Sequence, residues 1–125
     1  MYRISKQFHF SAAHRLERLP QDHPCHRLHG HNYVVEMVLE ADWLDRNGFV
    51  TDYGELAPVK EWLDEALDHR NLNEVLPELD GQTTAENIAR VVYERFKRQF
   101  TQLAAVRVSE TPKTWAEYRP NEEAA

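Results

Sequence analysis

The strongest constraint on the fold is a two-residue alternation of side chains over about residues 31–40. One face of this segment would carry Tyr33, Val35, Met37 and Leu39. The opposite face would carry Asn32, Val34, Glu36, Val38 and Glu40. A period of two is that of a β-strand with one face against a core. The chain is therefore expected to contain a sheet that is buried on one side.

Other segments extend this pattern into a complete layer. Strands are expected at about 3–10, 31–40, 103–110 and 115–119. Apolar residues at helical spacing predict helices over about 53–67 and 84–98, the second capped by Thr84. This order predicts an α+β fold, in which a four-stranded antiparallel sheet carries two helices on one face. Such a sheet has two open edges, which favour association with other copies, so we expect an oligomer.

Length and composition limit the class of protein. The chain has 125 residues, of which 42% are hydrophobic and 29% charged, as in an ordinary globular domain. We expect one domain over residues 1–120 and a flexible tail over 121–125. The net charge of −6 argues against nucleic-acid binding, and no apolar run is long enough to span a membrane. Cys25 is the only cysteine, which excludes an intrachain disulfide and fits a cytoplasmic protein.

The histidines are concentrated in one part of the chain, because six of the seven lie between positions 9 and 31. His29 and His31 are two residues apart in a predicted strand, so their side chains should share a face. His14 would approach that face if the first two strands form a hairpin. Three imidazoles with an open fourth position are typical of a catalytic zinc site. A His-x-His pair alone is more often a solvated surface feature, but the third histidine and the nearby cysteine favour metal binding.

Three further groups are candidates for chemistry. Cys25 lies in a polar loop where a nearby cation or metal would lower its pKa, which suits a nucleophile or a general base. It could instead be a fourth metal ligand that closes the site. Asp68 and His69 could form a proton relay, or simply be solvated residues at a helix end. Glu110 follows apolar positions of a predicted strand, and its carboxylate could accept the two parallel N–H donors of an aminopyrimidine; an exposed strand terminus is the alternative.

In their order along the chain, these residues resemble the 6-pyruvoyl-tetrahydropterin synthase family. The matching motifs run from Phe10 to Leu16, Cys25 to Tyr33, Asp52 to Leu56, Leu67 to Asn73, Thr84 to Asn87 and Glu110 to Thr111. The resemblance implies the family's T-fold, with element order ββααββ. It also implies trimers or hexamers with active sites at subunit interfaces.

The resemblance further implies a zinc enzyme that acts on 7,8-dihydroneopterin triphosphate. Its implied site residues are the zinc ligands His14, His29 and His31, the catalytic thiol Cys25, the proton-relay pair Asp68 and His69, the pterin anchor Glu110, and the further pterin contacts Thr84 and Glu86. The spacing of three residues between Cys25 and His29 resembles that of the 6-carboxy-tetrahydropterin synthases of queuosine biosynthesis. The alternatives are a 6-pyruvoyl-tetrahydropterin synthase and a non-enzymatic zinc- or purine-binding T-fold module.

Overall fold

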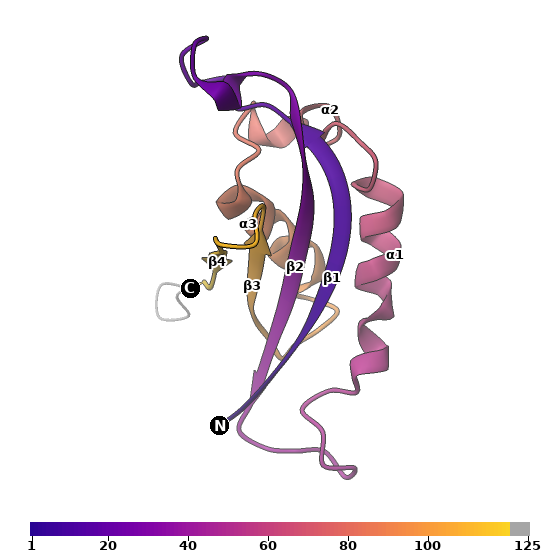
Figure 1. Ribbon diagram of the computed structural model, residues 1–125. Coiled ribbons are helices and arrows are strands. Elements are labelled where there is room, and N and C mark those ends of the chain that lie inside the picture. The colour runs from indigo at the N-terminus through magenta and orange to yellow at the C-terminus, as the bar shows by residue number, and fades with distance from the viewer. Residues whose placement is uncertain (121–125) are drawn as a thin grey trace.

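Two long strands dominate the computed structural model, which describes residues 1–120 (Figure 1). β1 (Tyr2–His14) and β2 (His29–Ala41) pair antiparallel from Tyr2 opposite Ala41 to His14 opposite His29. β3 (Leu103–Ser109) and β4 (Ala116–Tyr118) complete an antiparallel sheet of order β1-β2-β3-β4. The four predicted strands and their antiparallel pairing are therefore confirmed. The predicted tail, 121–125, lies outside the described residues.

The predicted helices are also present, with one addition. A 3-10 turn, Tyr53–Leu56, leads directly into α1 (Ala57–Ala66), and α3 covers Ala85–Phe96. Thr84 caps α3 as expected, because its hydroxyl accepts the N–H of Asn87 at 3.2 Å. Sequence analysis did not predict the single-turn α2 (Leu72–Val75). Short 3-10 turns also occur at Pro24–His26 and Pro77–Leu79.

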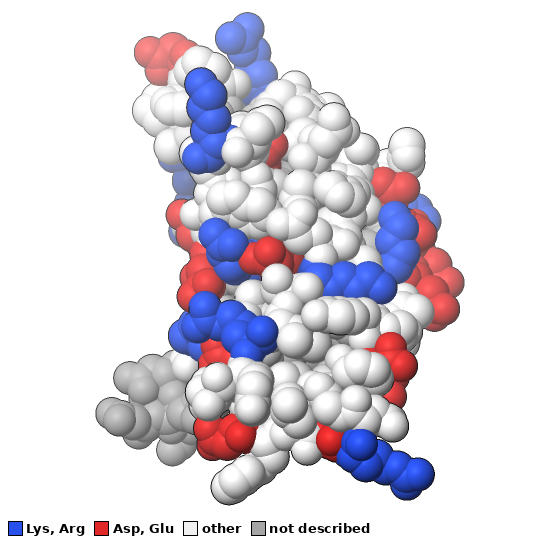
Figure 2. All heavy atoms as spheres, turned by 60° about the horizontal axis from the view of Figure 1, so that its bottom comes forward, with Lys and Arg blue, Asp and Glu red and all other residues white. Residues whose placement is uncertain are grey.

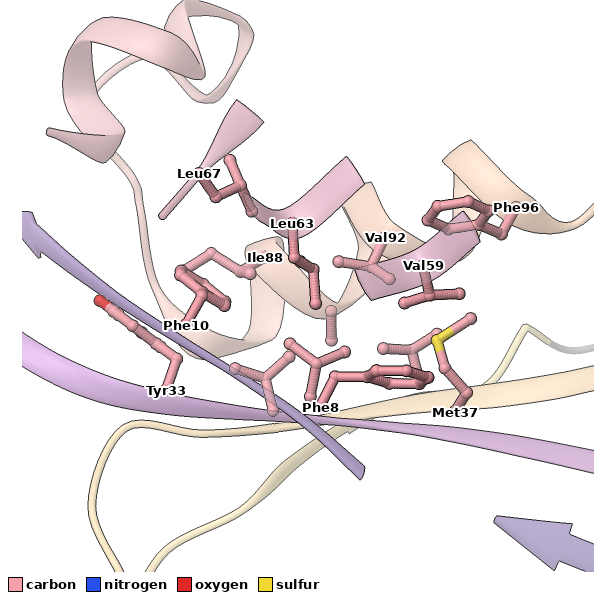
Figure 3. Packing of buried hydrophobic residues seen from close by; sticks show 14 of the residues in the cluster. Phe8, Phe10, Tyr33, Met37, Val59, Leu63, Leu67, Ile88, Val92 and Phe96 are labelled. Atoms are coloured by element: carbon pink, nitrogen blue, oxygen red, sulfur yellow. The ribbon is translucent and has the colours of Figure 1, made fainter. Parts of the chain in front are cut away.

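The core lies between these helices and one face of the sheet (Figure 3). α1 and α3 contribute Leu63 and Val92, which are fully buried. The sheet contributes the predicted apolar face of β2, in which Tyr33, Val35, Met37 and Leu39 have no exposed surface. Burying one large apolar side chain contributes roughly 1.5–3 kcal/mol, so this layer fixes the position of both long strands.

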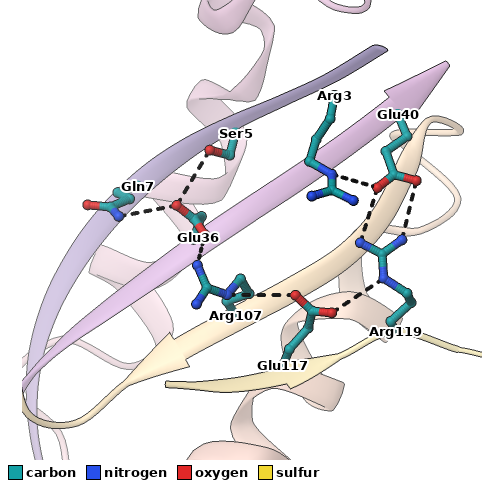
Figure 4. Close-up of polar contacts among 8 residues, drawn as sticks. All are labelled: Arg3, Ser5, Gln7, Glu36, Glu40, Arg107, Glu117 and Arg119. Carbon is teal, nitrogen blue, oxygen red and sulfur yellow. Dashed lines mark hydrogen bonds and ion pairs between the residues drawn. The ribbon is translucent and has the colours of Figure 1, made fainter. Parts of the chain in front are cut away.

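The opposite face of the sheet is polar and carries charges of both signs (Figure 4). Arg107 pairs with Glu36 at 2.7 Å, and Glu40 accepts from both Arg3 (2.9 Å) and Arg119 (3.1 Å). In the face shown by Figure 2, acidic and basic side chains are likewise interspersed. No helix within residues 1–120 has the length and apolar character that crossing a membrane requires.

Candidate metal centre

Three histidines meet at the end of the β1–β2 hairpin, at the top of Figure 1. His14 ends β1 directly opposite His29 at the start of β2, and His31 follows two residues later on the same face. One ring nitrogen from each lies within 4.8 Å of the others. Nitrogens bound to one zinc ion at about 2.0–2.1 Å are roughly 3–3.5 Å apart, so a small movement of the rings would let them share an ion. The convergence expected from the hairpin is thus present.

Backbone carbonyls orient two of these rings. The Nδ1 atom of His14 lies 2.7 Å from the carbonyl oxygen of Thr83, and that of His29 lies 2.7 Å from the carbonyl oxygen of Arg27. Because a carbonyl oxygen only accepts, we assign the ring hydrogen to Nδ1 in both residues. The Nε2 lone pairs are then free to bind a metal, in the arrangement typical of ligating histidines.

Burial provides an independent test of whether the residues fit a metal. The Nε2 atoms of His14 and His31 are buried and have no hydrogen-bond partner within residues 1–120. A buried polar atom without a partner is costly, and a divalent cation would satisfy both nitrogens. The donor set of neutral imidazoles therefore fits zinc.

Burial keeps the rings of His14 and His31 uncharged. Burial lowers the pKa of His14 to about 4, aided by repulsion from His29 and His31 and partly opposed by the hydrogen bond to Thr83. Burial likewise lowers the pKa of His31, although the carboxylate of Glu110 opposes this shift. Glu110 Oε2 lies 3.6 Å from His31 Nε2. Both rings are thus neutral at pH 7, which is the form that binds metal.

Tyr33 is a site residue that sequence analysis assigned only to the core. Its ring stacks on Phe10 with centroids 4.7 Å apart, and it lies nearly perpendicular to the rings of His14 and His31. Its hydroxyl is buried, has no hydrogen-bond partner in the described part of the chain, and points away from the core packing of Figure 3. Burial, together with the Glu110 carboxylate, raises its pKa, so the phenol is neutral. The alternation that places Tyr33 two residues after His31 is the signal that could have identified it.

Cys25 lies in the 3-10 turn of the loop between β1 and β2 and is half-buried. Its carbonyl oxygen accepts the N–H of Leu16 at 2.8 Å, which ties this turn to the end of β1 beside His14. Within residues 1–120, the cluster of converging ligand atoms consists of the three histidines and does not include Cys25. This geometry favours an open metal site over one closed by the thiol.

Asp68 and His69 contact each other and are fixed to the edge of β1. His69 Nε2 lies 3.4 Å from Asp68 Oδ2, although the His69 side chain is 80% exposed. The contact between adjacent residues accompanies a left-handed backbone at His69, with φ of 59°. Asp68 Oδ1 accepts the N–H of Ser11 at 2.8 Å, and the N–H of His69 donates to the carbonyl of Ser11. The pair is thus attached to β1 at Ser11, three residues before His14. Its role in proton transfer stays a prediction.

The remaining candidates occupy separate positions. Glu110 follows β3 and lines a hollow together with His31, Asn32, Ser109 and Thr111. Thr84 caps α3, and Glu86 is exposed in the first turn of that helix. No hydrogen bond or ion pair described for residues 1–120 joins the side chain of Thr84 or Glu86 to the histidine cluster. A single chain therefore brings together the three histidines and Glu110, whereas Thr84 and Glu86 lie outside this contact network.

Known proteins share both the sequence pattern and the fold of this chain. The family model for 6-pyruvoyl tetrahydropterin synthase matches residues 3–121. Haemophilus influenzae and Bacillus subtilis each have a protein named 6-carboxy-5,6,7,8-tetrahydropterin synthase that is similar to this chain. The first is 29% identical over 95% of this chain and 99% of its own length, and the second 31% identical over 95% and 86%. The structure of Caenorhabditis elegans 6-pyruvoyl tetrahydropterin synthase is 29% identical, covers 96% of both chains and superposes with a TM-score of 0.83. The expected T-fold is thereby confirmed.

Proposed function

Since this chain belongs to the 6-pyruvoyl tetrahydropterin synthase family, we propose that it is a zinc-dependent 6-carboxy-5,6,7,8-tetrahydropterin synthase. It would convert 7,8-dihydroneopterin triphosphate and one water molecule to 6-carboxytetrahydropterin, acetaldehyde and triphosphate, within 7-deazapurine (queuosine) biosynthesis. The convergence of three histidines, two of which have buried Nε2 atoms without a partner among the described residues, carries this proposal. The bacterial relatives that bear this name support the choice of reaction.

We assign His14, His29 and His31 as the metal ligands. Zinc held there would polarise the hydroxyl groups of the substrate side chain and lower their pKa. The carbonyls of Thr83 and Arg27, each 2.7 Å from a ring Nδ1, would leave the Nε2 atoms of His14 and His29 to hold the ion. The phenol of Tyr33 and the apolar packing behind it close the core side of the site against water.

Proton transfer would be shared between a thiol and an imidazole. Cys25, as a thiolate, would move a proton at the carbon next to the pterin ring. His69 would act as the complementary acid or base, and Asp68 would orient it through their 3.4 Å contact. The Ser11 backbone fixes Asp68 and hence the starting position of this pair. Side-chain cleavage would consume one water, which supplies the third oxygen shared between the carboxyl group and acetaldehyde. Oxidation of the side chain is balanced by reduction of the pterin ring, so no redox cofactor is needed.

Glu110 would bind the aminopyrimidine edge of the pterin. A carboxylate accepts two parallel N–H donors, and Glu110 is still 25% exposed toward its hollow. Thr84 and Glu86 would supply further pterin contacts. Because Glu86 and the ring of His69 are exposed in one chain, a second copy is the means we propose for completing the site.

The proposed partners are therefore the pterin triphosphate and further copies of this chain, as a trimer or hexamer with sites at subunit interfaces. The open edges of the sheet, and a β4 of only three residues, support such an assembly. Neither nucleic acid nor a membrane is proposed as a partner. The lone cysteine agrees with a cytoplasmic location.

The deciding experiment is to incubate zinc-loaded protein with 7,8-dihydroneopterin triphosphate and to identify the products by mass spectrometry. Acetaldehyde and a carboxylated pterin are expected. A 6-pyruvoyl product would favour the alternative synthase activity, to which the resemblance to the C. elegans structure lends support. Binding of zinc and pterin without turnover would instead favour a non-enzymatic T-fold module.

Cys25→Ala separates the roles of the thiol. We expect this variant to lose turnover while it keeps its metal content and fold, because Cys25 lies outside the converging ligand cluster. Full turnover would remove Cys25 from the mechanism. A strong thiolate-to-metal band in the resting cobalt-substituted protein would show instead that Cys25 closes the metal site.

A further inference from the structure

Residues 68–73 are hydrogen-bonded along the outer edge of β1 where it approaches His14. Three alternate residues of that edge, 11, 13 and 15, direct their N–H groups away from β2 and toward this segment. The pairs are Ser11 N–H to Asp68 Oδ1 (2.8 Å), Ala13 N–H to the Arg70 carbonyl (3.0 Å) and Arg15 N–H to Asn73 Oδ1 (2.9 Å). Ala13 and Asn71 also form a parallel bridge. The segment thus covers the outer edge of β1 near the histidines through one isolated bridge and two side-chain acceptors.

The side chain of Asn73 makes two hydrogen bonds to the backbone of Arg15, the residue after His14. Its Oδ1 accepts the N–H of Arg15 at 2.9 Å, and its Nδ2–H donates to the Arg15 carbonyl at 2.9 Å. Its own backbone is fixed, because its N–H donates to Asn71 Oδ1 at 3.0 Å at the start of α2. The neighbouring Leu72 is fully buried. The side-chain amide of Asn73 is therefore attached to a fixed part of the backbone.

The side-chain amide of Asn73 also lies close to Thr83, the residue that contacts the His14 ring. Thr83, which is fully buried, accepts from His14 Nδ1 through its carbonyl oxygen at 2.7 Å. The Thr83 hydroxyl also lies 3.4 Å from Asn73 Oδ1 and 3.5 Å from the Arg15 carbonyl. The backbone after His14 and the acceptor of its ring hydrogen thus belong to one hydrogen-bonded group. Ligand atoms need to be held within about 0.5 Å of their working position, so such a group matters for affinity.

We propose that Asn73 is a positioning residue for metal binding, which keeps His14 Nε2 aimed at the ion by fixing the backbone of Arg15. Asn73 contacts Arg15 and Thr83 and acts on the ion only through His14. The inference rests on the proposed function only in that His14 is a metal ligand. It assigns Asn73 a role that neither the converging histidines nor the predicted catalytic groups require.

The test compares zinc affinity, measured by competition with a chromophoric chelator, in the wild type, Asn73→Ala, Asn73→Asp and Asp45→Ala. Asp45 is a matched control, because its Oδ1 also makes two hydrogen bonds to the backbone, with the N–H groups of Asn47 (2.8 Å) and Phe49 (3.0 Å). It lies in the loop after β2, at the other end of the sheet from the histidines. The thermal midpoint of each metal-free protein reports the general loss of stability.

We expect the zinc dissociation constant to rise roughly 10- to 100-fold in Asn73→Ala, the range seen when outer-shell partners of metal ligands are removed. Asp45→Ala should bind zinc within about twofold of the wild type at a similar loss of thermal midpoint. Asn73→Asp is nearly isosteric and keeps the acceptor for Arg15 N–H, but it sets a carboxylate oxygen against the Arg15 carbonyl. It should also weaken zinc binding, and it settles the question if Asn73→Ala fails to fold.

Two results would overturn the inference in distinguishable ways. If the Asn73 variants bind zinc as tightly as Asp45→Ala, Asn73 has no positioning role and the metal assignment survives. If the wild type itself binds no zinc under replete conditions, the metal assignment falls and this inference falls with it. A changed d–d spectrum of the cobalt-substituted Asn73→Asp protein, with an unchanged spectrum in Asp45→Ala, would further support a distorted ligand geometry.

Discussion

Mild acid should destabilise the metal-free protein through His14. The folded protein binds a proton at this residue only near pH 4, because burial lowers its pKa from 6.5 to about 4. The unfolded chain takes up that proton near pH 6.5. Between these values the unfolded state binds more protons than the folded state, so falling pH favours unfolding. The stability is complete above about pH 6.5 and is lost as pH falls toward 4.

The size of this effect follows from the pKa difference. The shift from 6.5 to about 4 is about 2.5 units, which corresponds to about 3 kcal/mol when the titration is complete. Between pH 7 and pH 5 the loss is about 2 kcal/mol. A typical domain has only about 5–15 kcal/mol of stability, so this loss is easily measured. The lowered pKa of His31 acts in the same direction.

Urea unfolding in the presence of a chelator provides the assay. The free energy of unfolding is compared at pH 7 and pH 5, at one protein concentration, for the wild type and His14→Gln. Glutamine does not titrate, so the difference between the pH dependences of the two proteins isolates the contribution of His14. We expect the wild type to lose about 2 kcal/mol more than the variant over this interval. Parallel pH profiles in the two proteins would refute the reasoning, since His14 would then titrate alike in both states.

Further predictions concern the core, the site and the open face of the sheet. Leu63→Ala should lower the free energy of unfolding by about 2–5 kcal/mol in urea titrations, because Leu63 is fully buried; a loss below about 1 kcal/mol would contradict that packing. Tyr33→Phe should leave the thermal midpoint of the metal-free protein unchanged or slightly raised, since the Tyr33 hydroxyl has no hydrogen-bond partner among residues 1–120; a clear drop would reveal one. Arg119→Ala should cost less than about 1 kcal/mol of unfolding free energy, because its pairs with Glu40 and Glu117 are solvent-exposed. Zinc added in excess to chelator-treated wild type should raise its thermal midpoint, and an unchanged midpoint would argue against a metal site.

Much of the sheet could be predicted from sequence, because its signal is local. The alternation from Tyr33 to Leu39 fixes which face of β2 is buried, and the structure buries that face completely. The end of β1 had a weaker sequence signal. The strand runs to His14, beyond the predicted end at residue 10, and contains the weak strand formers Ser11, Ala12 and Ala13. Pairing with β2 on one side and with residues 68–71 on the other supports it, and neither partner lies nearby in sequence.

In the candidate site, too, residues with a local sequence signal could be predicted, and residues that depend on long-range contacts could not. His29 and His31 could be placed on one face from their spacing, and the hairpin brought in His14. Thr83 could not be found in this way, because its contact with His14 spans 69 residues and uses a backbone carbonyl that any residue type provides. Asn73 likewise belonged to a recognised motif, but its contact with Arg15 depends on the path of the chain through α2.

The segment of residues 68–73 that covers the outer edge of β1 also limits how the sheet can grow. From Ser11 to Arg15 the outer backbone groups of β1 are already occupied, and the carbonyl of His9 accepts from Lys60 at 3.2 Å. Any strand that joined this side could hydrogen-bond at most the stretch from Arg3 to Gln7. Pairing with an incoming strand would therefore end at Gln7, well before His14, so residues 68–73 reserve the part of this edge beside the histidines for contacts within the chain.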